Sequence, residues 1–348
     1  MSEWTDPHNP FNSMKSLVHA DRYETIMNGG VPAPVSVTID PTNKCNLNCH
    51  WCHCGQWRKE DPSEAPDNAL VNLARWLGRW KGLQSVCVAG GGEPTLHKDF
   101  NRLILELVSV DLSVSLITNG VNLSGDRLEA ARRCQFVGFS VDAGTSETYK
   151  VQKGADRFGT VLNNMAALSK HPGQCRSIGY KFILQPDTLP ELYIAAKMAL
   201  IHGATEFHCR PLCLDGLKWS EDDIKLAKEE IERARSILEC PDFHIYGITH
   251  KFNPNFGRKV PKACEVTPLA GLTFAADGWC YLCCDRRGDA EARMCKWEDA
   301  HDFWGGKKHR AMLKGLDTSL CHRRCTYVGY QEILDGVFRE DKMFRKFI

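Results

Sequence analysis

Three features are scarce in this sequence: long apolar runs, an excess of charge of one sign, and the pattern of a secretory signal. No stretch reaches the roughly 20 consecutive apolar residues that a membrane-spanning helix needs. The formal net charge is +1, so no global field attracts the protein to nucleic acid or to an anionic membrane. Residues 1–10 are polar and lack the basic and then apolar pattern of a signal peptide. We therefore expect a cytoplasmic protein whose partners include neither a membrane nor a nucleic acid.

Cysteine is the opposite case, because the sequence contains 17 of these residues. Thiols stay reduced in the cytosol, so clustered cysteines there indicate metal binding rather than disulfides. The odd number also argues against a fully paired disulfide framework. The remaining composition, with 43% hydrophobic and 25% charged residues, is ordinary for a globular protein.

The hydrophobic pattern alternates between strands and helices. Short apolar runs predict six strands, at 35–40, 85–89, 113–118, 136–140, 177–184 and 206–210. Helical periodicity predicts a helix after each strand, at 67–77, 98–110, 125–133, 157–169, 189–202 and 221–238. Asp67 is the expected N-cap of the first helix and Ser220 that of the last. This alternation predicts an α/β fold with a parallel sheet and right-handed crossovers.

Candidate functional residues follow several of these strands. Chemistry in parallel α/β sheets collects beyond the carboxyl ends of the strands. Those ends carry a cysteine loop at 45–52, the run Gly91-Gly92-Glu93-Pro94, and the residues Asn119, Ser140 and Arg210. We expect these features, which are far apart in sequence, to converge on one rim.

The alternation stops after Cys240. Residues 251–261 are rich in proline, glycine and asparagine and predict a linker. The cysteine-dense remainder, with a helix expected at 304–315, lacks the strand–helix rhythm. We therefore divide the chain into a lead-in segment (1–34), a core domain (35–250) and a C-terminal domain (251–348).

Cys45, Cys49 and Cys52 form a CxxxCxxC motif directly after the first strand. Three thiolates bind three irons of a [4Fe–4S] cluster and leave the fourth iron open to a small molecule. The competing interpretation is half of a zinc site, which Cys54 would complete. Zinc gives no reason for the Gly-Gly-Glu-Pro run after the next strand. There, glycines allow a close approach of the backbone to a ligand, and an acid beside them suits an ammonium group.

With these two motifs, residues 35–240 resemble the radical SAM enzymes. The resemblance implies a partial (β/α)6 TIM-like barrel. It implies that Cys45, Cys49 and Cys52 hold a [4Fe–4S] cluster whose open iron binds S-adenosyl-L-methionine. It also implies a cofactor-binding set: Trp51, Gly91, Gly92, Glu93, Pro94, Asn119, Ser140 and Lys153.

A second cysteine group lies in the C-terminal region, where its layout resembles the SPASM/Twitch extension of some radical SAM enzymes. That resemblance implies one auxiliary [4Fe–4S] cluster, with four ligands: Cys264, Cys283, Cys321 and Cys325. The seven cysteines of the full SPASM pattern are not present, which favours the shorter Twitch type. Three further cysteines are rival ligands: Cys280, Cys284 and Cys295. A zinc ribbon built from Cys280-xx-Cys283 and Cys321-xxx-Cys325 is the alternative.

Four polar residues of the last two predicted strands are candidates for substrate contact: Lys181, Gln185, His208 and Arg210. Strand alternation places His208 and Arg210 on one face. Arg210 is suited to hold a carboxylate or phosphate with two hydrogen bonds. The alternative is that all four form ordinary ion pairs at the rim of the sheet. The basic run 307–310 is expected to be a solvated helix face.

The resemblance implies an enzyme that cleaves S-adenosylmethionine reductively to a 5′-deoxyadenosyl radical. Our first expectation is hydrogen abstraction from a small polar metabolite, leading to oxidation or rearrangement, with the auxiliary cluster as electron acceptor. A reductase such as flavodoxin or ferredoxin is the expected electron donor. The main alternative is modification of a peptide or protein side chain. Nucleotide or nucleic-acid modification, and a non-enzymatic zinc or iron–sulfur protein, are further alternatives.

Overall fold

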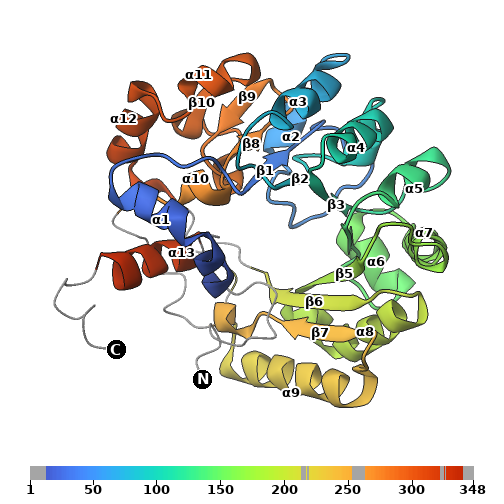
Figure 1. The fold of residues 1–348 in the computed structure, drawn as a ribbon. Coiled ribbons are helices and arrows are strands. Elements are labelled where there is room, and N and C mark those ends of the chain that lie inside the picture. The colour runs from blue at the N-terminus through green and yellow to red at the C-terminus, as the bar shows by residue number, and fades with distance from the viewer. Residues whose placement is uncertain are drawn as a thin grey trace.

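The computed structural model describes residues 13–212, 217, 219–252, 263–321, 325 and 327–339. A mixed α/β fold surrounds one ten-stranded sheet with the order β10-β9-β8-β1-β2-β3-β4-β5-β6-β7 (Figure 1). The predicted α/β class with a parallel central sheet is therefore confirmed. Within the described residues, no helix combines the length and apolarity that crossing a membrane requires.

Seven consecutive strands pair in parallel: β1 (Ser36–Ile39), β2 (Ser85–Val88), β3 (Ser113–Thr118), β4 (Phe136–Ser140), β5 (Ser177–Leu184), β6 (Glu206–Pro211) and β7 (His244–Gly247). The first six match the predicted strands. The seventh was not predicted, because His244–Gly247 is a run of only four residues with an exposed first position. Parallel register brings the carboxyl ends of all seven strands to the same edge.

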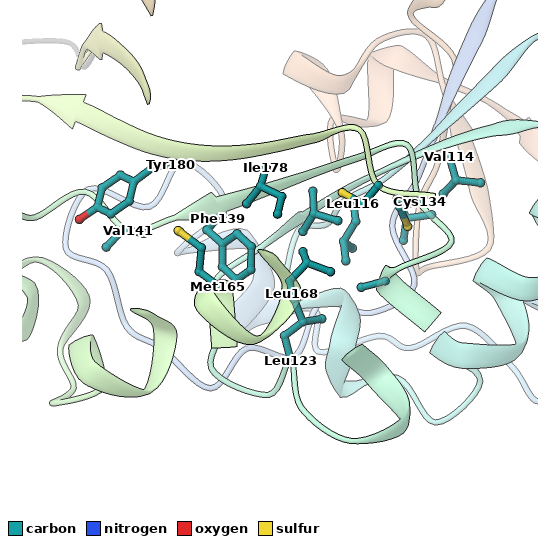
Figure 2. Close-up of a cluster of buried hydrophobic side chains, with 14 of the residues drawn as sticks. Val114, Leu116, Leu123, Cys134, Phe139, Val141, Met165, Leu168, Ile178 and Tyr180 are labelled. Carbon is teal, nitrogen blue, oxygen red and sulfur yellow. The ribbon is translucent and has the colours of Figure 1, made fainter. Parts of the chain in front are cut away.

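Helices connect the parallel strands along the outer side of the curved sheet (Figure 1). They are α2 (Trp57–Glu60), α3 (Ala69–Leu77), α4 (Phe100–Ser109), α5 (Asp126–Ala131), α6 (Ser146–Lys153), α7 (Phe158–Lys170), α8 (Leu192–Ile201) and α9 (Glu221–Leu238). The core lies between these helices and alternate strand residues. Figure 2 shows this packing, with Leu116, Phe139 and Ile178 of three strands facing Met165 and Leu168 of α7.

Helix boundaries reveal two local differences from the sequence expectations. Helix α3 begins at Ala69 with Asn68 as its N-cap residue, and Asp67 instead pairs with Lys98, so the predicted cap was wrong. Helix α9 does begin with the predicted capping box, in which Ser220 Oγ accepts from the Asp223 amide at 3.0 Å.

Three short strands extend the sheet beyond β1: β8 (Thr273–Phe274), β9 (Trp279–Tyr281) and β10 (Arg293–Lys296). Strand β8 pairs in parallel with β1, whereas β9 is antiparallel to both β8 and β10. Gly278, with φ of +78°, turns the chain between β8 and β9, a conformation that glycine adopts without strain. A β-hairpin made of β8 and β9 therefore precedes Cys283.

The remaining helices belong to the two ends of the chain: α1 (Ala20–Met27), α10 (Thr267–Ala270), α11 (Ala300–Phe303), α12 (Lys307–Gly315) and α13 (Val328–Ile333). Tyr23 and Ile26 of α1 pack with Leu269 and Ile333 in one apolar cluster, so the lead-in segment rests on the C-terminal region (Figure 1). The division at residues 34 and 250 stays a prediction. Most of the expected linker, residues 253–261, lies outside the described residues.

The run 307–310 is not a uniformly solvated face. Lys307, Lys308 and Arg310 are exposed, but His309 is 0% exposed. Its ring packs beside Phe303, with 5.5 Å between ring centroids. Helical geometry explains the difference, because only one residue of four consecutive positions needs to face the core.

Candidate functional site

The loop after β1 carries the first three cysteines at the carboxyl edge of the sheet. Burial raises the pKa of the Cys45 thiol, and the negative charges of Glu93 and Cys52 add to this effect. Burial likewise raises the pKa of Cys49, with further contributions from Cys52 and Cys45. The three sulfurs are therefore close enough to repel one another as thiolates, and a bound cation would relieve that repulsion.

This arrangement fits a cluster bound by three cysteines, although the thiols are not already closed around one point. Within the described part of the chain, no three His, Cys, Asp or Glu side chains form a ready metal-ion site. The assignment of ligands to Cys45, Cys49 and Cys52 therefore rests on the motif and on the proximity of the thiols. Cys54 lies in the same loop, and burial raises its pKa to about 11.

Helix α6 holds the cysteine loop from one side. The Asn48 amide donates to the Lys153 carbonyl at 3.0 Å, and Trp51 Nε1 donates to Gln152 Oε1 at 3.0 Å. The Lys153 ammonium lies 4.9 Å from the centre of the Trp51 ring. Both Trp51 and Lys153, predicted as cofactor-binding residues, therefore lie beside the second cysteine of the motif and contact each other.

Lys153 also forms a fully buried ion pair with Asp142. Burial alone would lower the pKa of Lys153, but Asp142 and Cys49 outweigh that effect and raise it. Asp142 has φ of +58°, an uncommon conformation for a residue other than glycine, and its Oδ1 accepts from the Ile183 amide at 2.7 Å. The sequence reasoning missed both Asp142 and helix α6. The available signal was Thr145, whose side chain caps that helix by accepting from the Thr148 amide.

The Gly-Gly-Glu-Pro run packs directly against the chain before Cys45. The Gly92 amide donates to the Thr42 carbonyl at 3.0 Å, and the Glu93 amide donates to the Lys44 carbonyl at 2.8 Å. A Cβ atom on Gly92 would lie 2.1 Å from the Lys44 carbonyl oxygen. Glycine is therefore required at position 92 for the two backbones to approach, and this approach places the two motifs side by side.

The Glu93 carboxylate links the ends of β2 and β3. Its Oε1 accepts from Thr95 Oγ1 at 2.7 Å and from Thr118 Oγ1 at 2.6 Å, and its Oε2 accepts from the Asn119 amide at 2.7 Å. Burial raises the pKa of Glu93 while these hydrogen bonds oppose the shift. Asn119 Nδ2 in turn donates to Asn46 Oδ1 at 2.7 Å and lies 3.9 Å from Cys45 Sγ. Glu93 and Asn119 are thus brought next to the cysteine loop, as predicted.

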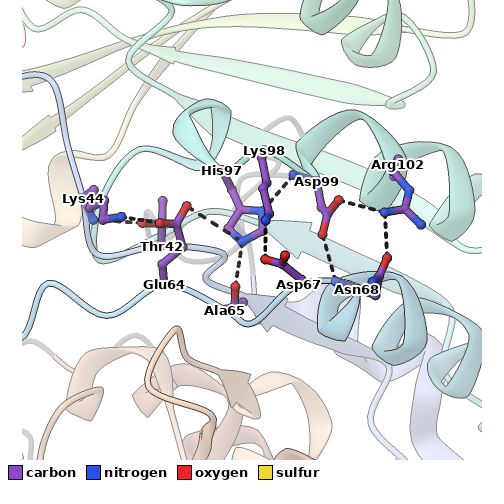
Figure 3. A network of polar contacts seen from close by, with 10 residues as sticks. All are labelled: Thr42, Lys44, Glu64, Ala65, Asp67, Asn68, His97, Lys98, Asp99 and Arg102. Atoms are coloured by element: carbon purple, nitrogen blue, oxygen red, sulfur yellow. Dashed lines mark hydrogen bonds and ion pairs between the residues drawn. The ribbon is translucent and has the colours of Figure 1, made fainter.

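A polar network joins the chain segments that flank the two motifs (Figure 3). Lys44 pairs with Glu64. The buried His97, three residues after Pro94, donates through Nε2 to the Ala65 carbonyl at 3.0 Å and accepts from the Asp99 amide at 3.0 Å. The segments before and after the two motifs are therefore tied together by hydrogen bonds, which limits the freedom of the loop entrance.

The four predicted C-terminal cysteines lie near one another. Burial raises the pKa of Cys264 to about 12, with added repulsion from Cys325 and Cys321. Burial also raises the pKa of Cys283, to which Asp285, Cys284 and Cys264 contribute. Cys264, Cys283, Cys321 and Cys325 are therefore linked by electrostatic repulsion, which fits a group bound by four thiolates, although within the described residues they are not already closed around one point.

The structure separates two of the three rival cysteines from this group. Cys280 and Cys295 face each other across β9 and β10 and share a side-chain hydrogen bond. Cys284 remains close, and its sulfur lies 3.6 Å from Tyr327 Oη. A zinc ribbon that uses Cys280 would have to break the pair with Cys295, so the geometry favours the set that contains Cys264.

The substrate-contact candidates divide into two groups. Gln185 Nε2 donates to Gln152 Oε1 at 2.7 Å, so this side chain supports the Trp51 contact. Lys181 and His208 are register neighbours on β5 and β6, on the sheet face opposite the helices. His208 contacts the Glu206 carboxylate, which sequence reasoning missed although Glu206 lies two positions away on the same strand face.

Arg210 lies on that face too and is exposed. Burial and, to a smaller extent, the Arg210 guanidinium lower the pKa of Lys181 to about 8. The Lys181 ammonium lies 5.4 Å from the centre of the Phe136 ring. A Cβ atom on Gly138 would lie 2.5 Å from Lys181 Cε, so glycine there makes room for the lysine chain. Lys181, His208 and Arg210 therefore share one face of the sheet with the Glu206 carboxylate, toward the carboxyl ends of β5 and β6.

Comparison with known proteins accounts for the presence of both the cysteine motif and the Gly-Gly-Glu-Pro run in one chain. Residues 39–180 match the family model described as "Radical SAM superfamily". The chain therefore contains a radical SAM domain in this segment. It is 34% identical over 145 residues to the mycofactocin maturase MftC of Mycobacterium ulcerans, covering 40% of this chain and 38% of the maturase. It is 29% identical over 271 residues to a probable GTP 3′,8-cyclase of Pyrococcus abyssi, covering 73% of this chain and 86% of the cyclase.

Solved structures show that this chain shares its fold with two further proteins. Streptococcus suis SuiB bound to S-adenosylmethionine aligns with a TM-score of 0.65 at 15% identity, over 92% of this chain and 79% of SuiB. The protein anSMEcpe with bound AdoMet aligns with a TM-score of 0.60 at 17% identity, over 81% and 83%. Among the first curated relatives, the chain spans 22%, 38% and 60% of the relatives' own lengths.

Proposed function

We propose that the protein is a radical SAM enzyme in which Cys45, Cys49 and Cys52 hold a [4Fe–4S] cluster with one open iron. The observation that carries this proposal is the backbone contact of Gly92 and Glu93 with the segment entering the cysteine loop. When bound, the cluster supplies the electron that splits the S–C bond of S-adenosylmethionine, and the resulting 5′-deoxyadenosyl radical removes hydrogen from the substrate.

The chain's own residues shape the cofactor position. Gly91 to Pro94 present backbone at the loop, and Asn119 and Ser140 follow on the next two strands. Lys153 holds Trp51 in place through the cation–π contact, and the buried Asp142 keeps that lysine charged. In this assignment Glu93 mainly fixes the rim, because its two oxygens already accept four hydrogen bonds from the protein.

We assign the C-terminal group as the ligands of one auxiliary [4Fe–4S] cluster: Cys264, Cys283, Cys321 and Cys325. The mutual repulsion of these thiols supports the assignment. A cluster with four protein ligands has no open iron, so the role proposed for it is to accept an electron from the substrate radical. A flavodoxin or ferredoxin in the cytoplasm is the proposed source of the first electron.

For the substrate we propose a peptide side chain, with a carboxylate or phosphate of the same molecule held by Arg210. SuiB, which shares the fold of this chain and has been solved bound to the precursor peptide SuiA, supports a peptide, and the exposed guanidinium of Arg210, whose charge acts on Lys181, supports an anionic group. A small polar metabolite, our first expectation from the sequence, remains the second candidate, because similarity to the cyclase covers 73% of the chain.

Anaerobic reconstitution with iron and sulfide tests the proposal. We expect about eight irons per chain, since two clusters contribute about four each. The electron paramagnetic resonance spectrum of the reduced protein should change when S-adenosylmethionine is added, because the open iron gains a ligand. Protein that contains zinc but no sulfide, or a spectrum that does not change when S-adenosylmethionine is added, would overturn the assignment. Incubation with candidate peptides or with GTP, followed by mass spectrometry, separates the two substrate classes.

A further inference from the structure

The short segment 284–288, directly after Cys283, contacts the first cysteine loop at its beginning. Arg287 Nη1 lies 2.9 Å from Asp40 Oδ2. The Asp40 side chain is 0% exposed and that of Arg287 is 12% exposed. Asp40 follows the last residue of β1 and precedes Cys45 by five positions. A buried ion pair therefore joins the C-terminal cysteine segment to the entrance of the cysteine loop.

The same segment also contacts the chain just after the loop. Trp57 is the first residue of α2. A Cβ atom on Gly288, whose φ is +79°, would lie 2.5 Å from Trp57 Nε1. A Cβ atom on Gly91 would lie 2.5 Å from Cζ3 of the same indole. The Trp57 ring is thus packed between the Gly-Gly-Glu-Pro run and the C-terminal segment, and both glycines are needed for this fit.

Arg287 also forms a hydrogen bond within its own segment. Its Nε donates to the Cys284 carbonyl at 2.9 Å, and its positive charge acts on the nearby Cys54 thiol within the loop. One side chain therefore contacts the backbone next to Cys283 and the carboxylate before Cys45. Removing either partner of such a pair leaves an uncompensated buried charge, which forces the two segments to move or to admit water.

We propose that Asp40 and Arg287 are positioning residues that couple the two cysteine groups, so that order in residues 45–57, from the cysteine loop to the start of α2, depends on the segment 283–288. Coupling of this kind is reciprocal, because each segment must stabilise the other by the same free energy. The inference rests on the proposed function for what the two groups hold, but the coupling itself belongs to the polypeptide.

Hydrogen exchange of the metal-free full-length protein tests the coupling. We expect Arg287→Gln to raise the exchange rate of amides in 45–57 at least about tenfold, and Asp40→Asn to do the same in 283–288, because each exposes its partner segment to local opening. The double variant should exchange no faster than the faster single variant, since both changes break one contact. Arg287→Lys, which keeps the charge, should recover part of the protection.

Arg286→Gln is the matched control. Arg286 pairs with Asp289 and Glu291 and contacts Cys321, all of them in the C-terminal part of the chain, so its loss should leave 45–57 unchanged. Exchange in α9 reports whether each variant is still folded. Unchanged exchange in 45–57 for a folded Arg287→Gln protein, or additive effects in the double variant, would overturn the proposal.

Spectroscopy of the reconstituted protein provides the second readout. Arg287→Gln should alter the resonance spectrum of the first cluster while all of its proposed ligands are intact, and an unaltered spectrum would contradict the coupling at that cluster. If the wild-type protein binds no iron but the variants show the expected changes in hydrogen exchange, only the proposed function is contradicted. The two failures are therefore distinguishable.

Discussion

The two cysteine groups gather their thiols from different distances along the chain. Cys45, Cys49 and Cys52 lie within eight consecutive positions of one loop, whereas the C-terminal set draws on segments around residues 264, 283 and 321–325. The first group is defined by spacing. The second is narrowed by the fold, because β9 and β10 direct the rival cysteines Cys280 and Cys295 toward each other. Spacing alone defines a local motif, whereas the sequence left rival ligands open in the second set, and the fold pairs two of those rivals with each other.

The two groups also differ in what surrounds them. Helix α6, the Gly-Gly-Glu-Pro run and the network of Figure 3 support the first loop. In the C-terminal group, Cys283 and Cys325 pack against the apolar cluster that contains Tyr23, Leu269 and Ile333. A polar support suits a site that binds a charged cofactor, and an apolar one suits a site that only exchanges electrons.

The largest expected effect is on the first group. Cys49→Ala should remove the first cluster and lower the iron content from about eight to about four per chain. The reason is that the two remaining thiolates, Cys45 and Cys52, cannot hold the cluster. Cys54→Ala is the control from the same loop and should retain the iron. Iron and sulfide analysis with the visible spectrum measures both, and equal losses in the two variants would show that Cys54 is a ligand.

The C-terminal assignment can be tested in the same way. Cys283→Ala should lower iron from about eight to about four per chain and leave the response of the first cluster to S-adenosylmethionine intact. Cys280→Ala should keep the iron, because its sulfur pairs with Cys295. The reverse pattern would favour the zinc-ribbon ligands.

Lys153→Met tests the support of the first loop. It leaves the Asp142 carboxylate buried without its partner, which should lower the free energy of unfolding by about 3–5 kcal/mol. Lys150 is exposed on the same helix, so Lys150→Met should change stability little. Urea denaturation compares the two, and similar midpoints would show that the buried pair is not important for stability.

Arg210→Gln tests the proposed contact of Arg210 with an anionic group of the substrate. We expect KM to rise about ten- to a hundredfold, because a hydrogen bond to a charged group contributes about 1.5–3 kcal/mol, while kcat changes less. Steady-state kinetics with the identified substrate measures this split. A fall in kcat without a change in KM would place Arg210 in the chemical step instead.

The smallest effect concerns the C-terminal region. Burial lowers the pKa of His309 to about 4, and within the described residues its Nε2 has no hydrogen-bond partner. In the unfolded chain His309 binds a proton below about pH 6.5, whereas in the folded chain it does so only near pH 4. The folded state is therefore fully stable above pH 6.5 and loses free energy of unfolding as the pH falls toward 4. The loss should be about 2–3 kcal/mol. Urea midpoints at pH 7 and pH 4.5 measure it, and His309→Phe should reduce the difference.

Sequence reasoning located six of the parallel strands because their apolar runs are bounded by glycine, proline or polar residues. It missed β7, whose four residues have no alternation, and α6, whose apolar content is low although Thr145 caps it. It found Glu93 and Asn119 from their positions at strand ends. It did not find Asp142 or Arg287, because their partners Lys153 and Asp40 become visible only when the chain is folded.

The most direct test of the account is whether the reconstituted, reduced protein converts S-adenosylmethionine to 5′-deoxyadenosine. We expect 5′-deoxyadenosine from the wild-type protein and from Cys54→Ala, and none from Cys49→Ala. Reconstituted protein that holds iron and sulfide but releases no 5′-deoxyadenosine under reduction, or release that persists in Cys49→Ala, would contradict the assignment of the Cys45–Cys52 loop as the radical-generating site.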